Sequence, residues 1–218
     1  MLMWLVGVLL TLACHALSRW LGGHFPRLPV VVVALLVLVA ALALMRWPYA
    51  EYFRVVGPFF NHLLGYVTVA LAIPLAAMRF DDLPRRPLIR LLGLATLTGA
   101  ALPMALAWGL QLSQPSVLAF ATRAVTTPIA LNIAAIIGSP PALVSLIVIV
   151  SGLIGAAASP WLLRNLNDER AAGLALGLAA HAIGTVEAWQ RGAVAGRYAA
   201  FGMAVNGLLT ACWVPLVF

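Results

Sequence analysis

Apolar residues dominate the chain in runs of about 20, and short polar connections separate these runs. Such a run crosses a bilayer core of roughly 30 Å as a helix. The runs lack the alternation of apolar and polar residues typical of a membrane β-barrel, so their backbone groups are expected to pair within helices. The pattern predicts an all-α, polytopic helical membrane protein of about eight spans, forming one domain over residues 1–218. The predicted spans are Leu2 to Trp20, Leu28 to Met45, Val56 to Met78, Leu88 to Leu110, Val117 to Ile137, Ala142 to Leu163, Ala171 to Trp189 and Tyr198 to Phe218.

Charged residues fall mainly in the connections, and this distribution predicts the orientation. All 13 basic residues are arginines, and every one except Arg123 lies between apolar runs or at their ends. The positive-inside rule then places both termini outside. A re-entrant segment around Arg123, in place of a full crossing, would put the two termini on opposite sides.

The composition excludes a soluble domain. Hydrophobic residues make up 64% of the 218 residues and charged residues 9%, whereas a soluble domain carries about 25% charged residues. A formal net charge of +7 could suggest nucleic-acid binding, but arginines at span ends are typical of topological anchors that contact phospholipid headgroups. We therefore expect the lipid bilayer as a partner and no nucleic acid.

The run from Phe120 to Pro128 interrupts an apolar span with an Arg, three Thr and a Pro. Pro128 disfavours helix at the residue before it and suits the first position of a new helix, which Thr126 or Thr127 would cap. The start of that half-helix and the Arg123 guanidinium would together bind an anion, with a carboxylate as the natural guest. The alternative is that Arg123 snorkels to the interface and Pro128 only kinks a continuous helix.

A second interruption places His181, Gly184 and Thr185 in one apolar span, followed by Glu187 near its end. His181 and Thr185 are four residues apart and share a helix face, and Gly184 can relax the helix between them. This pattern is compatible with a substrate or proton role for His181, and the alternative is a packing residue, which a lone histidine on an apolar face more often is.

Two asparagines, Asn132 and Asn206, also interrupt apolar runs. Neither a P-loop nor a recognisable hydrolase site nor a metal-ligand cluster appears in the sequence, so we expect no enzyme, no metal and no cofactor. Transport or pore formation remains as the predicted class of function.

Three blocks resemble signature segments of the LrgB/CidB family. They are Ala124-Val-Thr-Thr-Pro-Ile-Ala130, Ala180-His-Ala-Ile-Gly-Thr185 and Met203-Ala-Val-Asn-Gly207, and Gly65-Tyr-Val-Thr-Val-Ala-Leu-Ala-Ile-Pro-Leu75 resembles the amino-terminal block. They follow the family's order, and the resemblance covers the chain from Trp47 to Leu216. The family commonly has Pro-Lys-Ser where this chain has Thr122-Arg-Ala124, an acidic residue at Asn132 and a second Gly at Ser139.

The resemblance implies a multi-pass protein of the bacterial inner (cytoplasmic) membrane, usually paired with a small LrgA/CidA-like membrane partner. The family is described as antiholin-like or holin-like and is linked to murein hydrolases and autolysis. The resemblance also implies transport, because plant relatives resemble plastid glycolate/glycerate translocators and bacterial members are associated with the movement of pyruvate.

Taken together, the residues and the resemblance predict a secondary transporter of small monocarboxylates or 2-hydroxyacids of the pyruvate, glycolate and glycerate class. Discontinuous helices would line a central anion site, with H⁺ or Na⁺ as the possible coupling ion and a homodimer as the expected assembly. The predicted substrate-binding residues are Arg123, Thr126, Thr127, Pro128, Asn132, His181, Gly184, Thr185 and Asn206. The alternative is a holin-like or antiholin-like protein that modulates murein hydrolase activity. In the transporter hypothesis, the Arg123 to Asn132 and His181 to Thr185 segments converge on one cavity.

Overall fold

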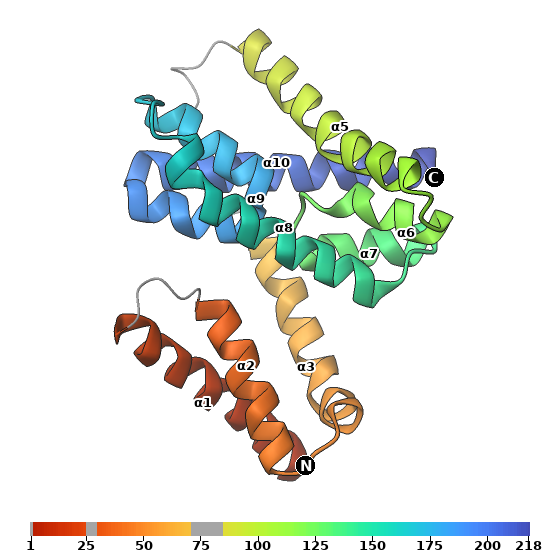
Figure 1. Ribbon diagram of the computed structural model, residues 1–218, viewed down its shortest axis with the longest axis vertical. Helices are drawn as coiled ribbons and strands as arrows, with labels where there is room; N and C mark the ends of the chain where they lie inside the picture. The colour runs from red at the N-terminus through yellow and green to blue at the C-terminus, as the bar shows by residue number, and fades with distance from the viewer. Residues whose placement is uncertain (1, 25–29, 71–84) are drawn as a thin grey trace. The chain divides into compact units, whose positions relative to one another are not determined.

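The computed structural model describes residues 2–24, 30–70 and 85–218, and these residues form helices joined by short connections, without a β-strand (Figure 1). The class predicted from the sequence, an all-helical protein, is therefore confirmed. Part of the predicted span Val56 to Met78 and the connection that holds Asp81 and Asp82 lie outside the described residues. The chain contacts define two compact units, Met1–Val67 and Thr68–Phe218, while the single membrane domain predicted for the whole chain stays a prediction.

The first unit contains three helices, α1 (Leu2–His24), α2 (Val30–Leu44) and α3 (Tyr49–Ala70), the last of which continues past the end of the unit. Its core is apolar and partly aromatic: Val8, Leu42, Trp47, Tyr52 and Val56 are buried together. One polar contact ties α1 to α3, because the Thr11 hydroxyl and the Tyr52 hydroxyl lie 2.6 Å apart. The unit holds none of the predicted site residues.

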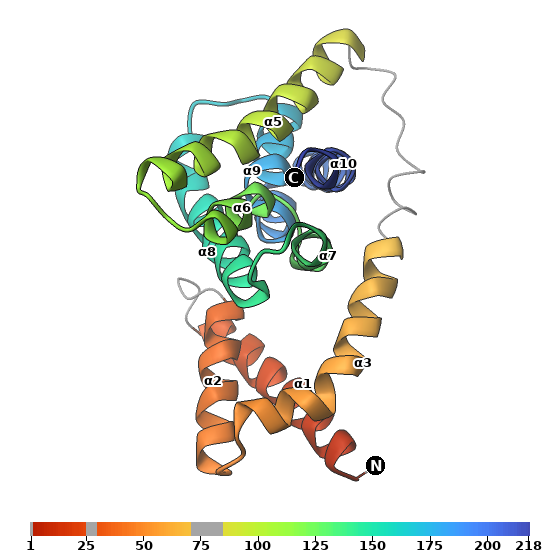
Figure 2. The same ribbon diagram turned by 90° about the vertical axis from the view of Figure 1, so that its right-hand side faces the viewer.

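The second unit contains all of the predicted site residues. Its helices are α5 (Arg85–Gly109), α6 (Gln114–Ala119), the 3₁₀ helix η1 (Phe120–Thr122), α7 (Thr127–Ile137), α8 (Pro141–Leu162), α9 (Glu169–Arg191) and α10 (Ala193–Val217). The last helix, α10, packs against α9, α5 and α7 (Figure 1 and Figure 2).

The segment from α6 to α7 reverses direction inside the unit. The Ser139 hydroxyl, just beyond α7, donates to the Pro115 carbonyl in the first turn of α6 at 3.2 Å, so the two outer ends of the segment meet. Each arm is about 15 Å long at 1.5 Å per residue, about half of a bilayer core. Residues 114–137 therefore form a half-length helical hairpin, called here the α6–α7 hairpin, and its tip is the Arg123 to Thr126 segment.

The helix α9 also doubles back. A straight helix of 23 residues would hold its ends about 33 Å apart. Instead Glu169 and Arg191, at the two ends, form an ion pair at 3.0 Å. The reversal lies at His181, whose φ of 41° and ψ of −125° are non-helical. Residues 169–191 thus form a second hairpin, the α9 hairpin, with His181 at its tip.

Glycines allow the α9 hairpin to pack closely on α10. A Cβ atom on Gly173 would collide with the Ala195 carbonyl oxygen, and one on Gly177 with the Ala199 carbonyl oxygen. Both contact pairs advance together along the chain, so the first arm of α9 runs parallel to α10. The second arm returns antiparallel to both, and small residues at the helix interface permit this close approach.

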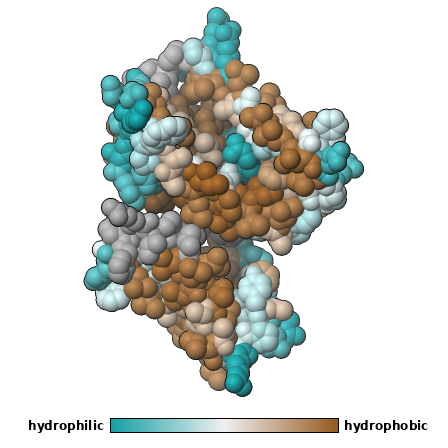
Figure 3. All heavy atoms as spheres, viewed as in Figure 1, coloured by the Kyte–Doolittle hydropathy of each residue, from teal (hydrophilic) through white to brown (hydrophobic). Residues whose placement is uncertain are grey.

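Five of the described helices, α1, α5, α8, α9 and α10, are long and apolar enough to span a membrane. Apolar side chains cover much of the visible face of the second unit, as expected for a surface in lipid (Figure 3). The helix α9 is one of the five by its length and composition. Because it reverses at His181, however, it does not form one straight crossing. The predicted total of about eight spans stays a prediction.

Candidate functional site

Arg123 lies at the tip of the α6–α7 hairpin and bonds to two other helices. Its Nε donates to the Gly99 carbonyl of α5 at 3.1 Å, and its Nη1 donates to the Ser151 hydroxyl of α8 at 3.0 Å. The side chain is partly buried. The guanidinium is thus held between two helices, and its Nη2 group makes no hydrogen bond to a described residue.

The charge of Arg123 has no partner of opposite sign within the described part of the chain. The ion pairs found there join Arg170 to Asp168 and Arg191 to Glu169. Both of the acceptors that Arg123 uses are neutral oxygens. A charge inside an apolar segment is costly, and in membrane proteins such residues mark ligand or ion pathways. The arrangement leaves a positive charge available to an anion.

Thr126, three residues after Arg123 in the chain, is the N-cap of α7. Its φ of −70° and ψ of 149° are extended, and its hydroxyl oxygen is buried without a hydrogen-bond partner. Thr127 and Pro128 form the partly exposed first turn, where a helix carries N–H groups without intrahelical acceptors and a positive partial charge. A helix start of this kind, close in the chain to Arg123, suits a carboxylate.

His181, at the tip of the α9 hairpin, reaches the same stretch of α8 that holds Arg123. Its Nε2 lies 3.1 Å from the Val148 carbonyl oxygen, and a Cβ on Gly152 would stand 2.7 Å from its Cε1. Val148 and Ser151 are three residues apart, so they lie on one face of the helix. The two hairpin tips therefore meet on one turn of α8.

Thr185 and Asn206 complete the polar contacts around the tips. The Thr185 hydroxyl donates to the His181 carbonyl at 2.8 Å and thereby supports the reversed backbone. The Asn206 amide nitrogen donates to the Ala124 carbonyl at 2.7 Å, while its amide oxygen accepts from the Thr96 hydroxyl at 2.8 Å. Asn206 is buried, and it links α10 and α5 to the residue that follows Arg123.

Two other predicted site residues lie apart from the hydrogen bonds around the tips. Asn132 is exposed on α7 and makes no hydrogen bond to a described residue, so the structure does not bring it to Arg123. Gly184 is a packing position, because a Cβ there would collide with the Leu176 carbonyl of the other arm and stand 2.7 Å from the Ala180 Cβ.

Several residues that were not predicted hold the predicted ones in place. Ser151 carried a signal, since a hydroxyl within an apolar span requires a partner. Thr96 carried the same signal in α5. The carbonyls of Gly99 and Val148 carried none, because main-chain acceptors are present at every position.

The structure offers no grouping of three or more His, Cys, Asp or Glu side chains that could hold a metal ion among the residues it describes. The chemistry of the site therefore rests on one guanidinium, hydroxyls, an imidazole, an amide and the start of α7.

Comparisons with known proteins give a consistent result over almost the whole chain. The model of the LrgB-like family matches residues 11–218. An uncharacterised protein of Bacillus subtilis, YwbG, is 30% identical over 220 residues, which cover 98% of this chain and 96% of the relative. An uncharacterised protein of Haemophilus influenzae is 31% identical over 95% of this chain and 89% of its own. The holin-like protein CidB of Staphylococcus aureus is 24% identical over 98% of this chain and 95% of its own. No solved structure matches the chain.

Proposed function

The chain belongs to the LrgB-like family, and from this premise we propose that it moves small solutes across the bacterial cytoplasmic membrane. Five apolar helices and family-wide similarity establish a multi-pass membrane protein of the LrgB/CidB class. Two modes of action follow, a holin-like mode and a carrier mode, and a different observation supports each.

The comparisons favour the holin-like mode, because the CidB relatives carry that description in their names. In this mode the protein opens the membrane to solutes or governs such opening, and so modulates murein hydrolase activity and autolysis. A small LrgA/CidA-like membrane protein is the proposed partner. Permeation through the assembly would be broad and would not saturate with solute concentration.

The carrier mode is supported by a single observation, the uncompensated charge of Arg123 in the same hairpin tip as Thr126, whose hydroxyl is buried without a partner at the start of α7. A small monocarboxylate or 2-hydroxyacid such as pyruvate, glycolate or glycerate would place its carboxylate there, with Thr127 and Pro128 forming the adjacent helix turn. His181, Thr185 and Asn206 would shape the rest of the path. Coupling to H⁺ or Na⁺ and a homodimeric assembly belong to this proposal.

Half-length hairpins are consistent with this mode. Transporters place substrate near the bilayer midplane, where interrupted helices expose their N-termini to anionic groups. Two hairpin tips that meet on α8 would provide a junction at which one hairpin can move against the other helices. The single hydrogen bond of His181 to Val148 is the contact that such a movement would break.

Uptake into liposomes tests the proposal and separates the modes. Purified full-length protein is reconstituted, and labelled pyruvate, glycolate and glycerate are offered outside, with erythritol as a neutral control and protein-free vesicles as background. Saturable uptake, with competition among the three anions and exclusion of erythritol, supports the carrier mode. Linear entry of all four solutes supports the holin-like mode. Solute entry equal to the background, with and without an LrgA-like partner, would contradict both.

A further inference from the structure

A cavity of about 370 Å³ lies between the end of α8 and the α9 hairpin, away from the Arg123 site, and is called here the α8–α9 cavity. It combines apolar walls with side chains that accept hydrogen bonds. The apolar walls are Pro160, Leu163 and Leu176, and the polar ones include Ser159, Glu187 and Gln190. A cavity of this size accommodates an organic group and is larger than a bare ion requires.

Arg191 also borders the cavity, but its charge is already compensated. Its Nε donates to Glu169 Oε1 at 3.0 Å, and its Nη2 and Nη1 donate to the carbonyls of Leu166 and Leu163 at 2.6 and 3.4 Å. These bonds tie both ends of the α9 hairpin to the end of α8. Arg191 therefore has little capacity left for an anion in the cavity.

Glu187 is the remaining charge in the cavity wall. It forms no ion pair with a basic residue of the described chain, and its side chain is partly buried. The carboxyl-terminal end of α8 adds negative partial charge on the same side, because its last carbonyls lack intrahelical donors. The oxygens of Ser159 and Gln190 can also accept. The net character of the cavity thus favours a cation that donates hydrogen bonds.

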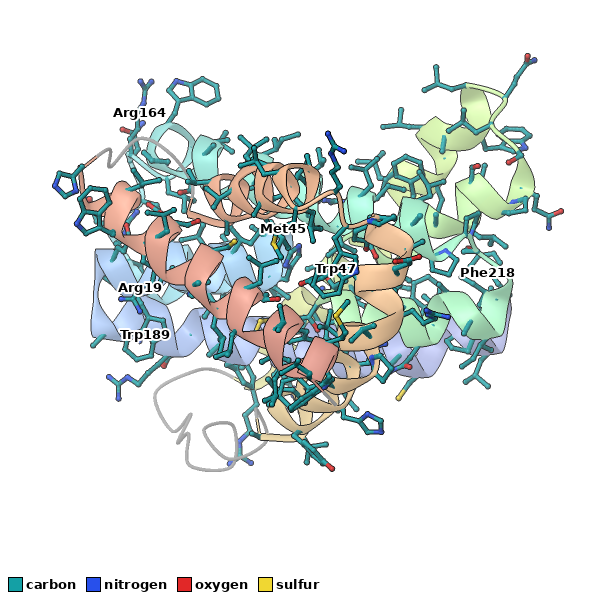
Figure 4. All side chains as sticks on the ribbon, turned by 90° about the horizontal axis from the view of Figure 1, so that it is seen from below. Arg19, Met45, Trp47, Arg164, Trp189 and Phe218 are labelled. Carbon is teal, nitrogen blue, oxygen red and sulfur yellow. The ribbon has the colours of Figure 1, made fainter. Side chains whose placement is uncertain are left out.

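The cavity lies at the level where phospholipid headgroups are expected. Trp161 and Trp189 are exposed, and each is the sequence neighbour of a residue that lines the cavity. Exposed tryptophans mark the membrane interface. Arg164 is exposed on the connection that follows α8, and Figure 4 shows Arg164 and Trp189 at the end of the unit opposite to Phe218. An arginine at this level can bind a lipid phosphate while the cavity binds the group attached to it.

We propose that the α8–α9 cavity binds a primary ammonium group, and that the headgroup of an ethanolamine phospholipid supplies it. The ammonium donates to the Glu187 carboxylate and to the oxygens of Gln190 and Ser159. The two-carbon linker contacts Leu163 and Leu176, and the phosphate remains at the interface. A choline headgroup fits less well, because three methyl groups replace its hydrogen-bond donors.

Native mass spectrometry of the purified full-length protein tests this proposal. Phosphatidylethanolamine and phosphatidylcholine with the same acyl chains are titrated, and free ethanolamine is added in a separate arm. We expect the protein to retain the ethanolamine lipid about tenfold more tightly than the choline lipid, a ratio equivalent to about 1.4 kcal/mol at 25 °C. Equal retention of the two lipids would overturn the proposal.

The variant Glu187→Gln removes the charge at constant size and should abolish the preference. Glu51→Gln is the matched control, because Glu51 is an exposed carboxylate in the first turn of α3 and should leave the preference unchanged.

A second variant, Gln190→Leu, removes a neutral acceptor and should lower the preference by about threefold, less than half of the charge effect on a free-energy scale. A preference that survives in both variants contradicts the proposed site. Displacement of the lipid by millimolar ethanolamine would overturn the lipid as the source and leave a soluble ammonium compound in its place.

Discussion

Two arginines, Arg123 at the tip of one hairpin and Arg191 at the base of the other, differ in the acceptors to which they donate hydrogen bonds. Arg191, at the base of the α9 hairpin, donates to a carboxylate and two main-chain carbonyls. Arg123, at the tip of the α6–α7 hairpin, donates only to the neutral oxygens of Gly99 and Ser151. The fold therefore neutralises one arginine where it fastens helices together, and orients the other without neutralising it.

The difference has an energetic meaning. An arginine whose only task is to join helices gains most from a carboxylate, because an unpaired charge in an apolar setting is expensive. Arg123 has no carboxylate partner among the described residues, so its charge is unfavourable in free energy. A ligand with a negative charge would offset this unfavourable term when it binds, and this is the physical basis of the proposed carrier mode.

The largest effect is expected from Arg123→Gln. Losing the charge-assisted contact should lower saturable uptake of pyruvate, glycolate or glycerate about 100-fold, equivalent to about 2.8 kcal/mol at 25 °C. The melting temperature should not fall, since the substitution removes an uncompensated charge. Uptake in liposomes and thermal unfolding in detergent measure the two quantities. A variant that transports at the wild-type rate would show that the contrast between the two arginines has no functional content.

Ser151→Ala should have an intermediate effect. The Ser151 hydroxyl accepts from Arg123 Nη1, and without it the guanidinium keeps only the Gly99 carbonyl and becomes less well oriented. We expect uptake at low substrate concentration to fall about tenfold, the loss of roughly one hydrogen bond to a charged group. The matched control is Ser145→Ala on the same helix, which should transport normally because Ser145 makes no hydrogen bond to Arg123. Equal losses in both variants would point to a general defect of α8.

The neutralised arginine, Arg191, should matter for stability and not for transport. Arg191→Gln should lower stability and preserve transport, the reverse of Arg123→Gln. The ion-paired side chains of Arg191 and Glu169 are 29% and 39% exposed, so solvent screens the pair and the expected loss is about 1 kcal/mol. Chemical or thermal unfolding of Arg191→Gln, Glu169→Gln and the double variant measures the coupling. Additive losses would mean that the two residues stabilise the hairpin independently.

The sequence allowed prediction of the chemistry of the two tips better than of their arrangement. Pro128 after two threonines predicts a helix start capped by Thr126 or Thr127, and in the structure Thr126 is the cap and α7 begins at Thr127. The interruption at His181 was also visible as polar chemistry in an apolar span. These signals are local, since capping and proline geometry depend on residues only a few positions apart.

The reversal of the two hairpins could not be predicted from the sequence, because it depends on contacts between residues far apart in the chain. Glu169 and Arg191 are separated by most of α9, and a periodic apolar pattern describes a straight span equally well. The same holds for the Thr96 to Asn206 bond, which links α5 to α10. Asn132, by contrast, could have been placed from periodicity, because the buried residues Ala130, Ile133, Ala134 and Ile137 define a face of α7 that excludes it.

A third arginine completes the comparison and should give the smallest effect. Asp168 caps α9, accepts from the Arg170 backbone N–H at 2.9 Å and pairs with the Arg170 guanidinium at 3.1 Å. The side-chain hydrogen bond from Arg170, with the backbone bond next, holds the pKa of Asp168 below its ordinary value. Its contribution to stability is therefore fully present above the pKa of the unfolded chain and is lost as the pH falls through the lower folded-state pKa. Asp168→Asn keeps a capping side chain and removes only the charge.

Thermal unfolding of the wild type and Asp168→Asn, measured from pH 7 down to pH 3, checks this last expectation. At neutral pH the wild type should melt slightly higher, by less than the Arg191→Gln difference, because both side chains of the Asp168 pair are more than 40% exposed and solvent screens them. The two curves should converge as the pH falls below the ordinary aspartate pKa of about 3.9 and through the lower pKa of folded Asp168. A difference as large as that of Arg191→Gln would mean that exposure does not set the strength of these pairs. The difference between Arg123 and the paired arginines would then have to come from their positions in the fold and not from pairing with a carboxylate.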